Sequence, residues 1–182
     1  NPAVLTVGEE SGIGDDEDGT YTAQYTPTSA GTDMGIGQLW EKLADVTDAL
    51  LPMVYPSHYQ RGSYGIAHPN ASPYETVKTA LQHAVRRNAK IENPPTVIAW
   101  LQDFTLGPPR YDASYVRAQI DAVYDAGLKD WVLWHPGSNY SIEALASADG
   151  VAPRLPRPSG AAVSTTARAA RSRASESFSE SR

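Results

Sequence analysis

The chain contains no cysteine among its 182 residues. This absence excludes disulfide bonds, thiolate nucleophiles and thiolate metal ligands, and it is compatible with an oxidising or a reducing compartment. The sequence also lacks any apolar run near the roughly 20 residues that a membrane span requires. Residues 1–20 have neither a basic n-region nor an apolar h-region, so we expect no export signal there.

Basic residues are missing from the first part of the chain. Residues 1–33 hold seven acidic residues and no Lys or Arg, whereas residues 151–182 hold six arginines. The middle of the chain is close to electrically balanced and therefore offers no basic face for nucleic acid. The arginine-containing end lacks the interleaved aromatic residues of a single-strand binder, so we expect no nucleic-acid partner.

Composition divides the chain into three parts. We expect residues 1–31 to form a weakly ordered acidic segment, because Gly, Thr and acids dominate there without apolar periodicity. The acidic run at 15–18 does not follow the EF-hand pattern, which favours a solvated loop over a calcium site. Residues 32–148 carry the periodic apolar patterns of a folded domain. Residues 149–182 are rich in Pro, Arg, Ser and Ala, and we expect a disordered tail.

Apolar periodicity predicts several helices in the middle of the chain. Ser72-Pro73-Tyr74-Glu75 reads as a capping box with proline at the first helical position. Gly127 is a natural helix stop because glycine readily adopts positive φ. The predicted helices span residues 38–50, 72–88, 113–126 and 141–148.

Three short apolar runs predict buried strands near residues 50–55, 96–101 and 131–134. Strands alternating with helices indicate an α/β fold with a parallel sheet. Polar and aromatic residues follow each run, which is how a (β/α)8 TIM-type barrel builds its active site. Because a complete barrel needs eight strands, we expect an incomplete barrel whose unpaired edges would favour self-association.

Asp103 is the best candidate for a catalytic acid. It follows a buried strand and is flanked by Gln102 and Phe104. A carboxyl group beside aromatic surface tends to have a raised pKa, which suits a general acid. The alternative is a structural aspartate that caps the following loop. Glycosidases usually need a second carboxyl group; Asp33 is a weaker candidate, and the partner could lie upstream of residue 1.

His58, in a loop directly after a strand, could relay a proton or stabilise charge, or it could be a loop histidine bonded to backbone. The adjacent Ser57 is not a hydrolase nucleophile, because the Gly-x-Ser-x-Gly turn is absent. The four histidines have no paired metal-ligand spacing, so we expect no metal site and no cofactor.

Aromatic rings gather near these polar groups, and sugar rings present apolar faces that stack on such platforms. Each tryptophan taken alone is more simply explained as core, but their repetition at three strand ends favours carbohydrate. The candidate substrate-binding residues, which include polar neighbours of the rings, are Tyr55, Tyr59, Trp100, Gln102, Trp134 and His135, with Tyr140 as a further ring.

Five blocks of sequence occur in an order that matches a known family. They are Asp33-Met34-Gly35-Ile36-Gly37-Gln38, Pro52-Met53-Val54-Tyr55-Pro56-Ser57-His58-Tyr59, Pro69-Asn70-Ala71-Ser72-Pro73-Tyr74, Trp100-Leu101-Gln102-Asp103-Phe104, and Gln119 with Trp134-His135-Pro136. Together they resemble the bacterial β/α-barrel glycoside hydrolases known as the DUF4015 domain, over residues 32–146.

The resemblance implies that the chain holds the carboxyl-terminal portion of the barrel and that the family hydrolyses carbohydrate. It implies sugar-site roles for Tyr55, His58, Tyr59, Gln102 and Asp103, and a secreted or cell-envelope setting. At His135 the family more usually has Asn.

Three functions compete on this reading. The first is hydrolysis of a glycosidic bond in a polysaccharide or oligosaccharide. The second is a non-catalytic carbohydrate-binding or inert barrel fragment that lacks the second carboxylate. The third, a phosphate-binding α/β module, is weak because no Gly-rich loop follows any predicted strand.

Overall fold

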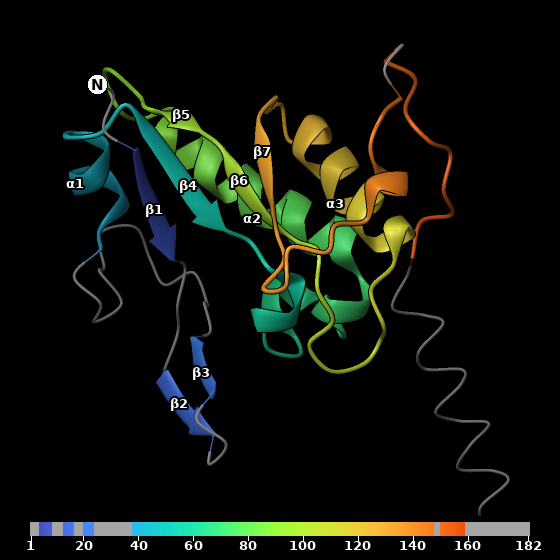
Figure 1. Ribbon diagram of the computed structural model, residues 1–182. Coiled ribbons are helices and arrows are strands. Elements are labelled where there is room, and N and C mark those ends of the chain that lie inside the picture. The colour runs from blue at the N-terminus through green and yellow to red at the C-terminus, as the bar shows by residue number, and fades with distance from the viewer. Residues whose placement is uncertain (1–3, 9–12, 17–19, 24–37, 148–149, 159–182) are drawn as a thin grey trace, which may run out of the picture.

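The computed structural model of the chain describes residues 4–8, 13–16, 20–23, 38–147 and 150–158. These residues form an α/β structure in which two long helices cover one face of a parallel sheet (Figure 1). The parallel sheet expected from the sequence is confirmed.

The sheet has the strand order β1-β4-β6-β7, with the short strand β5 also paired to β4. All of these pairings are parallel. The carboxyl ends of β4, β6 and β7 therefore lie along one edge of the sheet. The strands are β1 (Val4–Gly8), β4 (Ala49–Met53), β5 (Thr96–Val97), β6 (Ala99–Gln102) and β7 (Trp131–Trp134).

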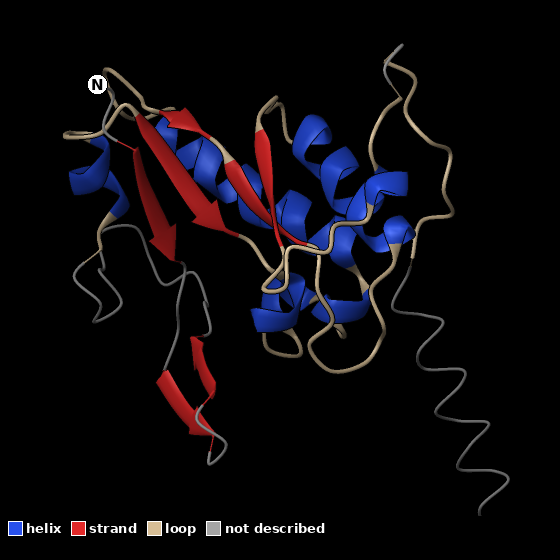
Figure 2. Ribbon diagram, in the orientation of Figure 1, coloured by secondary structure: helices blue, strands red, loops and turns tan. Residues whose placement is uncertain are grey.

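The α-helices are α1 (Trp40–Ala44), α2 (Pro73–Asn88) and α3 (Ala113–Asp125). Short 3-10 turns follow the strands, namely η1 (Pro56–His58), η2 (Ser63–Gly65), η3 (Pro69–Ala71) and η4 (Ile142–Ala144). Helices α2 and α3 pack against each other beneath the strands (Figure 2). The predicted helices at 72–88 and 113–126 are thus confirmed, and Gly127 ends α3 with a φ of +86°.

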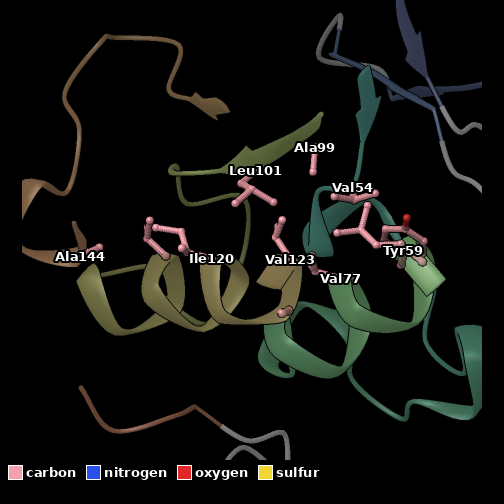
Figure 3. Close-up of a cluster of buried hydrophobic side chains, with 12 residues drawn as sticks. Val54, Tyr59, Val77, Ala99, Leu101, Ile120, Val123 and Ala144 are labelled. Carbon is pink, nitrogen blue, oxygen red and sulfur yellow. The ribbon is translucent and has the colours of Figure 1, made fainter. Parts of the chain in front are cut away.

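The larger hydrophobic core lies between the sheet and these two helices. Ala99 and Leu101 extend from β6 toward Ile120 and Val123 of α3 (Figure 3). Leu101, Ile120 and Val123 are fully buried, and each such side chain contributes about 1.5–3 kcal/mol by leaving water. Because side chains alternate along a strand, the core takes every second residue of β6 and leaves Trp100 to the other face.

The prediction of a helix over residues 38–50 is wrong beyond its first turns. The helix α1 ends at Ala44, and β4 begins at Ala49. The prediction rested on Leu39, Leu43, Val46 and Leu50, which recur at helical spacing. That spacing is a coincidence, because Val46 is 71% exposed and Leu50 belongs to the strand.

Two other local predictions need correction. Ser72 precedes α2, but its side chain makes no capping hydrogen bond. The hydroxyl of Thr76 instead donates to the carbonyl of Pro69, 3.2 Å away. The expected helix at 141–148 is only the 3-10 turn η4, and Leu145, which follows it, has extended backbone angles.

Within residues 1–31, the parts that the structure describes form three strands that the sequence patterns did not predict. Strand β1 pairs with β4, while β2 (Ile13–Asp16) and β3 (Thr20–Ala23) form an antiparallel pair. Val4-Leu5-Thr6-Val7 has β-forming residues, but the run is short and its partner lies more than 40 residues away, beyond the reach of local patterns. In the predicted tail, residues 150–158 contain no helix or strand, and the remainder of that prediction, residues 159–182, lies outside the described residues.

Candidate functional site

A cavity of about 530 Å³ lies at the carboxyl ends of β6 and β7. Its walls come from the two loops that follow these strands. The loop after β6 contributes residues 103–105 and 110–113, and the loop after β7 contributes His135, Asn139, Ser141 and Glu143. The volume falls within the usual range of small-molecule sites.

Asp103 lines this cavity and is 4% exposed. Its two carboxylate oxygens each accept one hydrogen bond from Ser141. The backbone N–H of Ser141 donates to Oδ2 at 2.7 Å and its hydroxyl donates to Oδ1 at 2.7 Å. Both oxygens of the Asp103 carboxyl group thus act as hydrogen-bond acceptors. These bonds support the alternative that Asp103 is a structural aspartate which holds a loop, beside the alternative that it is catalytic.

Gln102 is fully buried, and its polar atoms are bonded to the protein. Its side-chain oxygen accepts from the Ser57 N–H at 3.0 Å, and its side-chain nitrogen donates to the Phe104 carbonyl at 2.9 Å. The amide of Gln119 in α3 bonds with both backbone groups of Gln102, at 2.9 and 2.8 Å. Gln102 is not among the residues that line the cavity, and it ties the loop after β4 to the end of β6.

His135 lines the cavity from the end of β7. Its Nδ1 accepts the backbone N–H groups of Gly137 at 2.9 Å and Asn139 at 3.3 Å. A nitrogen that accepts carries no proton, so the neutral ring carries its proton on Nε2 and can donate one hydrogen bond to a ligand. The Tyr140 ring stands edge-on to His135, with ring centroids 6.2 Å apart.

Tyr55 and His58 lie behind the cavity wall. Neither lines the cavity, but the rings of both lie near Phe104, which does. The Tyr55 and Phe104 ring centroids are 5.5 Å apart, and those of Tyr55 and His58 are 5.3 Å apart. Burial lowers the pKa of His58 below its ordinary 6.5 and raises the pKa of the Tyr55 hydroxyl. Both groups are therefore kept uncharged near neutral pH.

The two strand tryptophans meet on the face of the sheet opposite the core. Trp100 and Trp134 form an edge-to-face pair with centroids 6.0 Å apart, and Trp134 is 44% exposed. The indole N–H of Trp100 is buried without a hydrogen-bond partner among the described residues. Neither ring lines the cavity. Tyr59 belongs to the hydrophobic core, as Figure 3 shows, and is 6% exposed.

The loop after β6, between its two cavity-lining segments, is held by Asn70 of η3. Its side-chain nitrogen donates to the carbonyls of Leu106 and Pro108, both at 3.1 Å. The Tyr111 hydroxyl donates in turn to the Asn70 carbonyl at 3.2 Å. These bonds fix the loop after β6, and with it the buried Tyr111 in the cavity wall.

Sequence reasoning missed three charged residues that line the cavity: Arg110, Asp112 and Glu143. Asp112 was recognisable as a helix cap, and its carboxylate accepts from the Ser114 N–H at 2.8 Å. Arg110 and Glu143 lie in loops without a periodic pattern, so the sequence carried no local signal for them. Asp33, the weaker second carboxylate of the sequence analysis, lies outside the described residues.

In the part of the chain that the structure describes, no three His, Asp or Glu side chains gather as metal ligands. Within the same part, no helix combines the length and the apolar character needed to cross a membrane.

One family model matches this chain over residues 22–140; it is the DUF4015 model, whose description is "Putative glycosyl hydrolase domain". The match contains β4, β6, β7 and most residues of the cavity wall. No curated protein and no solved structure matches the chain.

Proposed function

Because the chain belongs to the DUF4015 family, whose description is "Putative glycosyl hydrolase domain", we propose that it hydrolyses O-glycosidic bonds in a polysaccharide or oligosaccharide. The observation that carries this proposal is the cavity at the carboxyl ends of β6 and β7, with the buried carboxylate of Asp103 in its wall. Glycoside hydrolysis depends on carboxyl groups placed beside the scissile bond.

Asp103 is the proposed catalytic carboxylate, and His135 is a proposed sugar contact through Nε2–H. Tyr55 and His58 support the site from behind Phe104. The exposed face of Trp134 suits the apolar face of a sugar ring beyond the cavity. The roles of Tyr59, Trp100 and Gln102 as direct sugar contacts have less support, since none of them lines the cavity.

We propose further that the described sheet is the carboxyl-terminal portion of a (β/α)8 barrel. Three features support this: β4, β6 and β7 are parallel neighbours in chain order, their connections contain α2 and α3, and the cavity lies at their carboxyl ends. Among the described strands, β7 has one neighbour, which supports self-association through its open edge.

The test is Asp103→Asn, assayed for release of reducing ends from a panel of cell-wall and plant glycans. We expect a loss of at least about 100-fold in kcat/KM, because the amide can neither accept nor supply a proton as the carboxyl group does. Asp130→Asn is the matched control, since Asp130 is exposed at the opposite end of β7. Unchanged activity in the Asp103 variant would contradict the proposed role.

A non-catalytic carbohydrate-binding function is the second candidate. It is favoured by the complete engagement of both Asp103 oxygens by Ser141, which suits a structural carboxylate. Under that function a glycan would raise the thermal unfolding temperature of the wild type and of the Asp103 variant equally, without any release of reducing ends.

A further inference from the structure

We propose, on the basis of the glycosidase function above, that Glu143 is the second catalytic carboxyl group and acts as the general acid. Glu143 belongs to the 3-10 turn η4 in the loop after β7. It lines the same cavity as Asp103. Glu143 is therefore a candidate for the second carboxyl group, which the sequence analysis left unassigned.

The contact between Asp103 and Ser141 determines how far apart the two carboxyl groups can be. The Ser141 nitrogen is 2.7 Å from Asp103 Oδ2, and Glu143 follows Ser141 by two residues. Two residues of chain span at most about 7 Å, so the Glu143 backbone lies within about 10 Å of the Asp103 carboxylate. The flexible Glu side chain can then reach separations of about 5–5.5 Å for retention or 6.5–9.5 Å for inversion.

The other carboxylates of the cavity are already engaged. Asp112 caps α3 and accepts from both the backbone N–H and the hydroxyl of Ser114. Asp103 accepts from Ser141 on both oxygens. Glu143 is exposed, and it has no hydrogen bond or ion pair with any described residue. Of the three, Glu143 is therefore the carboxyl group whose oxygens have no hydrogen-bond partner within the described residues.

This assignment divides the chemistry between the two groups. Glu143 gives its proton to the glycosidic oxygen as the bond from that oxygen to the anomeric carbon breaks, and the bonding electron pair leaves with the departing alcohol. Asp103, ionised, either takes a proton from the attacking water or bonds to the anomeric carbon until water displaces it. One water is consumed in either course. Where Asp103 takes the proton from the attacking water, that proton leaves to solvent and Glu143 takes another from solvent; where Asp103 bonds to the anomeric carbon, Glu143 takes its proton directly from the water that displaces Asp103.

The experiment compares Glu143→Gln with wild type on two glycosides of one sugar. In one glycoside the leaving group is 2,4-dinitrophenolate, which departs without being protonated. In the other the leaving group is phenol, which departs only when an acid protonates the glycosidic oxygen. The sugar is chosen by screening common aryl pyranosides and taking the one that the wild-type protein hydrolyses fastest. We expect Glu143→Gln to lose at least about 100-fold in kcat/KM on the phenyl glycoside. On the dinitrophenyl glycoside we expect a loss of less than about 10-fold, because the acid is no longer needed.

Two variants distinguish the outcomes. Glu92→Gln is the matched control, because Glu92 is exposed just before β5, at the opposite end of the strands; it should match wild type on both glycosides. Asp103→Asn should lose activity on both, since its step does not depend on the leaving group. Equal losses on both glycosides in Glu143→Gln, or no loss, would overturn the assignment alone. A wild-type chain that is inactive on every aryl glycoside and also releases no reducing ends from the glycan panel would overturn the glycosidase function, and the assignment with it.

Discussion

Ser141 donates two hydrogen bonds of 2.7 Å to Asp103, a residue 38 positions earlier in the chain. The pair joins the loop after β7 to the end of β6, and both residues line the cavity. Because the acceptor is a buried carboxylate, each bond is charge-assisted and stronger than a bond between neutral groups. The shape of the cavity therefore depends on this contact as much as on the strands below it.

Ser141→Ala should destabilise the protein by about 1.5–3 kcal/mol, because it removes a hydrogen bond to a buried charged group. The backbone N–H of residue 141 still donates, so the loop should keep its path. Urea unfolding at neutral pH measures the change. Thr79→Ala is the control, since that half-buried hydroxyl of α2 has no hydrogen bond in the described chain, and its removal should leave stability nearly unchanged. Equal stability of the two variants would contradict the importance of the Ser141 hydroxyl.

Gln119→Leu should cost about 2–5 kcal/mol, because it leaves the buried N–H and carbonyl of Gln102 without partners. Gln119 is fully buried, so water cannot take the place of its amide. Gln82→Leu on α2, a half-buried position without a described hydrogen bond, should change stability by less than about 0.5 kcal/mol. A Gln119→Leu protein as stable as wild type in urea would show that the two amides are not coupled as described.

Stability should fall as the pH drops below neutrality, in part because of His58. Burial lowers its folded-state pKa below 6.5. Above pH 6.5 both states are neutral and His58 has no effect; below it the unfolded chain binds a proton that the folded protein does not, which favours unfolding. This loss grows until the pH reaches the lower folded-state pKa.

His58→Gln should therefore flatten the dependence of the urea midpoint on pH between 7 and 5. His83 has a lowered pKa for the same reason, burial, with Arg86 adding to it. The double variant His58→Gln/His83→Gln should be flatter still. Parallel pH curves for wild type and His58→Gln would refute the contribution of His58.

Arg157→Ala should loosen the segment at residues 150–158 without unfolding the domain. The Arg157 guanidinium lies 3.6 Å from the centroid of the Tyr74 ring, a cation–π contact worth about 0.5–1 kcal/mol at an exposed site. Hydrogen exchange of residues 150–158 should quicken about two- to five-fold. Arg154→Ala is the matched control, because Arg154 is exposed in the same segment without a described partner. Identical exchange in both variants would exclude an anchoring role for Arg157.

The sequence predicted the helices with long apolar stripes. It also predicted the strands that pair with a neighbour close in the chain. The helix α2 has 16 residues and α3 has 13, so their apolar stripes repeat several times. The prediction of a helix at 38–50 was wrong because its apolar stripe has only four residues. A short helix followed by a strand produces the same spacing of apolar residues. Strand β1 was missed because its partner β4 is distant in sequence.

Of the residues that line the cavity, the sequence predicted those that follow a strand and missed those that lie farther along the loops. Asp103 and His135 were found because each follows a recognisable strand, and both line the cavity. Glu143 was missed because a 3-10 turn of three residues has no periodicity, and its place in the cavity wall depends on contacts of its neighbours Ser141 and Ala144 with distant residues. Gln102 and Tyr59, which we also predicted as sugar contacts, are buried and do not line the cavity, and the sequence carried no signal that distinguishes a buried polar or aromatic residue from an accessible one.

The adjacent Gln102 and Asp103 have one more consequence, which concerns how such a protein can be re-engineered. Gln102 bonds to the loop after β4, and Asp103 bonds to the loop after β7. The loops that follow β4, β6 and β7 are therefore not interchangeable parts. A loop transplanted after β7 would have to bring a serine in register with Asp103, and one transplanted after β4 would have to present a free backbone N–H to Gln102.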